Sequence, residues 1–159
     1  MALVRLDVRF EDLGALADVA NASHVVVSVI DADSIVALSS LHDALKSPIG
    51  VWLEVSEDYS AQMAARDVKT LSWLVTLDTV VVSGPHADAS ARVLRALLTN
   101  DEVNFTNSVA TIVGAYNRPA PPRPVTVWSV DGAVLRQGDE VLEETSKETT
   151  EVGEATTYR

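Results

Sequence analysis

The chain has 159 residues, of which 47% are hydrophobic, and this composition predicts a folded domain rather than a disordered chain. Its formal net charge of -11 disfavours nucleic acid and anionic membranes as partners, and no apolar run approaches the ~20 residues that span a bilayer. The absence of cysteine excludes disulfides, a thiolate nucleophile and cysteine-ligated zinc. Together with the charged residues among the first ten positions, which are not typical of a signal peptide, these features predict a cytoplasmic protein.

Segments with the patterns of strands and helices alternate along the chain up to residue 131. Five segments are rich in β-branched and apolar residues, and a segment with apolar residues at helical spacing follows each of the first four. This alternation predicts βα units that build a parallel sheet. After residue 101 the pattern loosens and fits either short extended pieces or an irregular excursion. The predicted strands are residues 2–10, 23–30, 47–55, 76–84 and 124–130, and the predicted helices are residues 11–22, 31–45, 58–74 and 87–99.

A proline-rich stretch, AYNRPAPPRPVTVW (115–128), precedes the last of these strands. Its prolines cannot continue a helix, and each also disfavours a helical conformation in the residue before it. The stretch is therefore expected to deliver the chain, already extended, to the fifth strand. The alternative is a proline-rich ligand for a partner domain.

The C-terminal segment differs from the rest in charge. Residues 131–159 contain eight acidic residues against three basic ones and are rich in threonine and glutamate. Such a composition predicts that residues 132–159 form an acidic, flexible, solvated tail, so that the folded domain covers residues 1–131. A docking tail is the alternative.

Three segments, in this order, resemble luciferase-like flavin- or deazaflavin-dependent monooxygenases. The helix segment AARDVKTLSWL (64–74) resembles that family's Ala-Arg helix. The stretch VLRALLTNDEVNFTN (93–107) resembles the point at which the family's chain leaves a barrel helix, and NRPAPPRPVTVW (117–128) resembles the proline-rich approach to the next barrel strand. The family's Ser-x-Gly-Arg turn is absent from LSWLVTLDTVVVSG (71–84). The resemblance implies a (β/α)8-type barrel that binds FMN or F420 at the carboxyl ends of its strands.

Polar residues follow the predicted strands, where function gathers in βα folds. Glu54 ends an apolar strand and is a candidate base, and His86 in SGPHAD (83–88) is a candidate acid or base. Ser83 and Gly84 are candidate cofactor-binding residues, because small residues before a helix can hold an anion, and Ser56 is a third candidate because it follows a predicted strand. Solvent-exposed strand ends and an ordinary capped turn are the alternatives. The three histidines lack HxH or HExxH spacing, so no metal site is expected.

A full (β/α)8 barrel needs about 250 residues, so the chain is expected to form a partial, TIM-barrel-like α/β domain of about five parallel strands and four helices. Open strand edges would then invite a homo-oligomer or a complementary protein chain. Two functions fit these expectations. One is a flavin- or F420-dependent oxidoreductase related to the monooxygenases. The other is a non-catalytic binding or assembly protein that retains a half-barrel.

Overall fold

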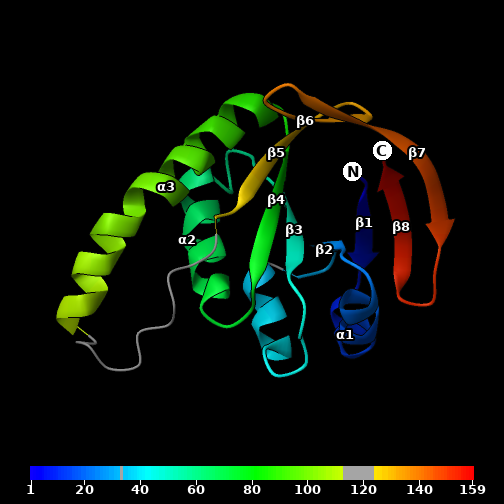
Figure 1. The fold of residues 1–159 in the computed structure, drawn as a ribbon, viewed down its shortest axis with the longest axis horizontal. Coiled ribbons are helices and arrows are strands. Elements are labelled where there is room, and N and C mark those ends of the chain that lie inside the picture. The colour runs from blue at the N-terminus through cyan, green and yellow to red at the C-terminus, as the bar shows by residue number, and fades with distance from the viewer. Residues whose placement is uncertain (33, 113–123) are drawn as a thin grey trace.

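A computed structural model describes residues 1–32, 34–112 and 124–159, with side chains omitted from 100 to 112. Strands and helices alternate up to β5, after which only strands follow (Figure 1). The elements are β1 (Leu3–Val8), the 3-10 helix η1 (Phe10–Asp12), α1 (Leu13–Ala22), β2 (Val26–Val29), the 3-10 helix η2 (Ile35–Leu41), β3 (Ile49–Glu54), α2 (Ala61–Ser72), β4 (Leu77–Ser83), α3 (Ala87–Ile112), β5 (Thr126–Asp131), β6 (Val134–Gln137), β7 (Glu140–Thr149) and β8 (Gly153–Tyr158).

The strands form a closed barrel in the order of the chain, from β1 to β8. Neighbouring strands from β1 to β5 are parallel, whereas β5, β6, β7 and β8 pair antiparallel. The ring closes where β8 pairs antiparallel with β1, in a register that runs from Leu3 opposite Tyr158 to Val8 opposite Gly153. In Figure 1 the helices lie on the side of β1 to β5, and no helix lies beside β7.

Two apolar clusters follow from the alternation of side chains along the strands. In β3, Ile49, Val51 and Leu53 belong to the larger cluster, which includes the buried faces of the helices. Trp52, between them, belongs to a smaller cluster inside the barrel, with Leu3, Val26, Val81, Trp128, Leu135, Leu142 and Tyr158. The inner cluster draws on both the parallel and the antiparallel strands, so both halves contribute to one core.

The predicted architecture, a partial TIM-barrel-like domain of about five parallel strands, is wrong. The five predicted strands do occur, at β1 to β5, but three more strands complete a mixed eight-stranded barrel. The barrel closes without the three further βα units of a TIM barrel, because antiparallel strands joined by short turns take their place. Luciferase-like TIM-barrel architecture is excluded by the same observation.

The segment 132–159, expected to be a flexible tail, forms β6, β7 and β8. Two glycines with positive φ angles, Gly132 (φ 60) and Gly138 (φ 58), form the turns that join β5 to β6 and β6 to β7. Glycine adopts this conformation without the steric cost that other residues incur. The acidic residues of the segment are compatible with strands because they occupy solvent-exposed positions, and in β7 only Leu142 is buried.

Two helical segments also differ from the prediction. The predicted helix 31–45 contains the 3-10 helix η2, and α3 continues to Ile112 through the stretch whose pattern loosened after residue 101. Residues 115–123 of the proline-rich stretch lie outside the described residues. No helix of the described chain is both long and apolar enough to cross a membrane.

Closure of the barrel leaves no open edge at β1 or at the last parallel strand, because β8 pairs with β1 and β6 pairs with β5. A partner chain was predicted only from such open edges. A homo-oligomer or a complementary chain therefore stays a prediction without this support.

Candidate functional site

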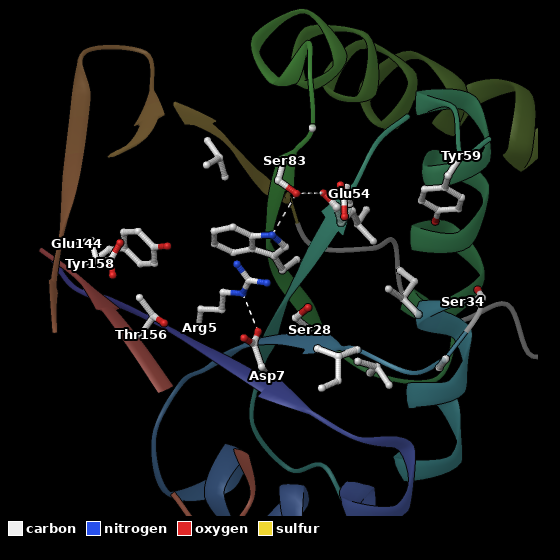
Figure 2. A pocket seen from close by; sticks show the side chains of 18 of the residues that line it. Arg5, Asp7, Ser28, Ser34, Glu54, Tyr59, Ser83, Glu144, Thr156 and Tyr158 are labelled. Atoms are coloured by element: carbon white, nitrogen blue, oxygen red, sulfur yellow. Dashed lines mark hydrogen bonds and ion pairs between the residues drawn. The ribbon is translucent and has the colours of Figure 1, made fainter. Parts of the chain in front are cut away.

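A cavity of about 840 Å³ opens at the carboxyl ends of the parallel strands. Residues from β1, β2, β3 and β4 form one side, and residues from β7 and β8 form the other (Figure 2). Its volume lies within the range of about 300–1,000 Å³ that is typical of small-molecule sites. Neither half of the barrel encloses the cavity alone.

Arg5 lies in the centre of the cavity (Figure 2). Its Nε atom donates a hydrogen bond of 2.7 Å to Asp7 Oδ1, and its guanidinium carbon lies 4.0 Å from the ring centroid of Trp52. Arg5 and Asp7 are two residues apart on one strand, so both side chains point to the inner face. Stacking on the ring and pairing with the carboxylate hold the guanidinium in a fixed orientation.

Trp52 is in turn fixed by Ser83 on the neighbouring strand. Its Nε1–H donates to Ser83 Oγ at 3.2 Å, and the Ser83 hydroxyl donates to the Leu53 carbonyl oxygen at 3.2 Å. The indole N–H is thus satisfied although only 8% of Trp52 is exposed. A polar chain from Asp7 through Arg5 and Trp52 to Ser83 crosses the floor of the cavity.

Tyr158, from β8, supplies the aromatic side of the opposite wall. Its ring centroid lies 6.0 Å from that of Trp52, at an interplanar angle of 31°. Burial raises the pKa of Tyr158, and the carboxylate of Glu144 contributes in the same direction, whereas Arg5 opposes it. Tyr158 therefore stays a neutral hydroxyl at physiological pH, able to donate and accept hydrogen bonds.

A second set of hydrogen-bonded polar side chains, Tyr59, Ser34 and Asp67, lies beside α2 and η2. Tyr59 donates from its hydroxyl to Asp67 Oδ2 at 2.8 Å, and Ser34 donates to the same oxygen at 3.1 Å. Burial is the main cause that raises the pKa of Tyr59, and the Asp67 carboxylate adds to it. These bonds tie the residues before η2 to α2 and fix one rim of the cavity, since both Tyr59 and Ser34 line it.

The structure brings together three of the five predicted site residues. Glu54, Ser83 and Gly84 line the cavity, with Glu54 solvent-exposed at the end of β3. Ser56 and His86 are not among its lining residues, and both side chains are exposed. Gly84 has φ 125, and a side-chain carbon there would overlap the Val55 carbonyl oxygen. Its role in the structure is therefore to let two backbones approach closely.

The sequence prediction missed the residues at the centre of the cavity. Arg5 and Asp7 alternate with apolar residues in LVRLDV, and two charged residues on one face of a strand were a usable signal. Thr156 and Tyr158 were missed because their segment was expected to be a tail. None of the four follows a parallel strand, which was the rule used to choose candidates.

No group of three or more His, Asp or Glu residues in the described parts of the chain is arranged to hold a metal ion. Comparisons with protein-family models, curated proteins and solved structures gave no significant match. The site must therefore be interpreted from its own geometry.

Proposed function

We propose that the protein binds a small polar molecule in the cavity at the mouth of the barrel. The observation that carries this proposal is the cavity of about 840 Å³ whose floor is the fixed Asp7, Arg5 and Trp52 group. Preorganised polar groups in a concave, partly aromatic site are typical of ligand-binding pockets. This corresponds to the binding alternative from the sequence, without the half-barrel on which it was based.

Several hydroxyl groups around the cavity offer further hydrogen bonds to a ligand. Ser28 comes from β2, Thr156 and Tyr158 come from β8, and all three line the cavity. Hydroxyl groups both donate and accept, so they suit a ligand with several polar atoms. Trp52 and Ile30 are among the apolar residues of the lining.

The oxidoreductase function was inferred from a luciferase-like TIM barrel. The observed fold is a different barrel, so this function stays a prediction without that support. Binding of FMN or F420 stays a prediction, as does a cytoplasmic location. FMN is therefore one of the probes below rather than the expected ligand.

The test is a titration watched by NMR at the indole N–H of Trp52, which is assigned by its loss in Trp52→Phe. Four probes represent four chemistries: 2-phenylethylamine, 3-phenylpropionate, D-glucose and FMN. We expect at least one probe to shift this resonance at millimolar concentration.

Ser28→Phe should abolish the shift, because Ser28 is half-buried and lines the cavity. Thr99→Phe is the matched control, since Thr99 is exposed on α3 and does not line the cavity. The proposal is contradicted if no probe shifts the Trp52 indole, or if the shift persists in a folded Ser28→Phe protein.

A further inference from the structure

We propose that the ligand of this cavity is a small organic cation, which binds between the carboxylates of Glu54 and Glu144 with its body against Tyr158. This inference rests on the proposed function and specifies the class of ligand. It follows from the charges that line the cavity, from the partners of those charges, and from the way the site binds the guanidinium of its own Arg5.

The cavity wall is negatively charged. Its acidic residues are Asp7, Glu54, Asp58 and Glu144, and its basic residues are Arg5 and Lys147. Two positive charges minus four negative charges give a net charge of -2 for the lining. The whole chain carries -11 as well, so the long-range field also attracts cations.

Both cations of the lining already have carboxylate partners. Arg5 pairs with Asp7 at 2.7 Å, and Lys147 Nζ lies 3.6 Å from Glu154 Oε1. In the parts of the chain that the structure describes, no ion pair joins Glu54, Asp58 or Glu144 to a basic residue. An anionic ligand would therefore meet neutralised cations and three uncompensated carboxylates, whereas a cation would meet their attraction directly.

The site already holds one organic cation of its own. The guanidinium of Arg5 lies over the ring of Trp52 and is neutralised by Asp7. A carboxylate beside an aromatic ring is the combination that binds a cation, through charge and through the ring quadrupole.

A second pair of this kind occurs on the opposite wall. Glu144 and Tyr158 are directly opposite in the pairing of β7 with β8, and both line the cavity. Figure 2 shows Glu144 and Tyr158 side by side across the cavity from Glu54. A cation in the cavity would thus have Glu144 and Tyr158 on one wall and Glu54 on the facing wall.

The experiment uses three probes of nearly equal shape, titrated into the full chain at pH 7: 2-phenylethylamine, 2-phenylethanol and 3-phenylpropionate. They carry a positive, a zero and a negative charge. The Trp52 indole resonance reports binding at the site. We expect the amine to bind at least about 10-fold more tightly than the carboxylate, and its affinity to fall as salt rises from 0.05 to 0.5 M, because exposed charges are screened over about 10 Å at 0.1 M.

Two variants locate the charge. Glu54→Gln and Glu144→Gln should each weaken the amine about 2- to 5-fold, the effect of one exposed ion pair, and leave the alcohol unchanged. Glu151→Gln removes the same charge from an exposed position that does not line the cavity, and should change neither probe. Because Glu54 and Glu144 are exposed, these variants are expected to fold, which their thermal unfolding checks.

The outcomes separate this inference from the proposed function. If the carboxylate or the alcohol binds at the Trp52 site as tightly as the amine, the cavity is a binding site and the cationic ligand is wrong. If amine binding is equal in Glu54→Gln, Glu144→Gln and Glu151→Gln, the assignment of the charge to the cavity is likewise wrong. If none of these probes, D-glucose or FMN shifts the indole, the proposed function itself fails.

Discussion

The parallel strands β1 to β5, here called the covered half because helices lie beside them, differ in burial from the antiparallel strands β6 to β8, the uncovered half. In β3, every residue from Ile49 to Leu53 is buried, because one face meets helices and the other meets the barrel interior. In β7, only Leu142 is buried. Parallel strands that are covered on both faces are continuous apolar runs, whereas antiparallel strands can expose one face to water. One closed barrel can therefore combine a half that is easily recognised in a sequence with a half that resembles a tail.

The cavity depends on this combination. The covered half supplies Arg5, Trp52 and Ser83. Asp7 on the same strand and the ring of Trp52 hold Arg5, and Ser83 on the neighbouring strand holds Trp52. The uncovered half supplies Glu144 and Tyr158. A rigid floor and a more solvent-exposed wall suit a site that a small molecule enters from solvent.

The largest expected effect is that of removing the uncovered half. Deletion of residues 132–159 leaves the edges of β1 and β5 unpaired and exposes Leu3, Trp52 and Trp128 to water. We expect the truncated chain to lose its cooperative unfolding transition in circular dichroism. The control is Val141→Ala in the full chain, which should change the unfolding free energy by no more than about 0.5 kcal/mol, because the Val141 side chain is 44% exposed. A truncated chain that unfolds cooperatively would show that these strands are dispensable.

The next effect compares one leucine from each half. Leu71, on α2, and Leu135, on β6, are both 0% exposed. Leu71→Ala and Leu135→Ala should each lower the unfolding free energy by about 2–5 kcal/mol, through lost burial and the cavity left behind. Urea denaturation measures both. A negligible effect at Leu135 alone would mean that the uncovered half does not share the core.

A smaller effect concerns Arg5, which lies between the two halves. Arg5→Lys loses the fixed pairing with Asp7 and much of the stacking on Trp52, and should cost about 1 kcal/mol. It should also shift the Trp52 indole resonance. Arg92→Lys, in an exposed pair with Asp88, should cost less than about 0.5 kcal/mol and leave that resonance in place. Equal effects at the two positions would contradict the assigned role of Arg5.

The smallest effect appears only in alkali. The pKa values of Tyr59 and Tyr158 are raised above the ordinary value of 10.0, mainly by burial. The unfolded chain therefore loses these protons first, so the stabilisation is complete below pH 10 and is lost as the pH rises above it. The urea midpoint should fall between pH 9 and 11.5, and it should fall less in Tyr59→Phe and Tyr158→Phe. Parallel pH profiles for all three proteins would exclude the two tyrosines as the cause.

The sequence predicted the strands at β1 to β5 because runs such as VVVSV and TVVVS are apolar enough for burial on both faces. It did not predict β6 to β8, because only isolated residues such as Leu135 and Leu142 are buried there. The signals that marked these strands were Asp131-Gly132 and Gly138-Asp139, which are typical of hairpin turns. The prediction judged this segment by its acidic composition and did not use those turns.

Part of the candidate site, at the carboxyl ends of parallel strands, was predicted, and the part that depends on the antiparallel strands was not. Glu54 and Ser83 follow parallel strands, where the rule for βα folds applies, and both line the cavity. Arg5 and Tyr158 could not be placed by that rule, because their proximity depends on the pairing of β1 with β8 across almost the whole chain. A contact between residues that are so far apart leaves no local pattern in the sequence.

The most direct test of this account is NMR measurement of contacts between β1 and β8. We expect cross-strand nuclear Overhauser effects that follow the register from Leu3 with Tyr158 to Val8 with Gly153, together with slow amide exchange in both strands. Absence of these contacts, with rapid exchange after residue 132, would contradict the closed barrel and the cavity that depends on it.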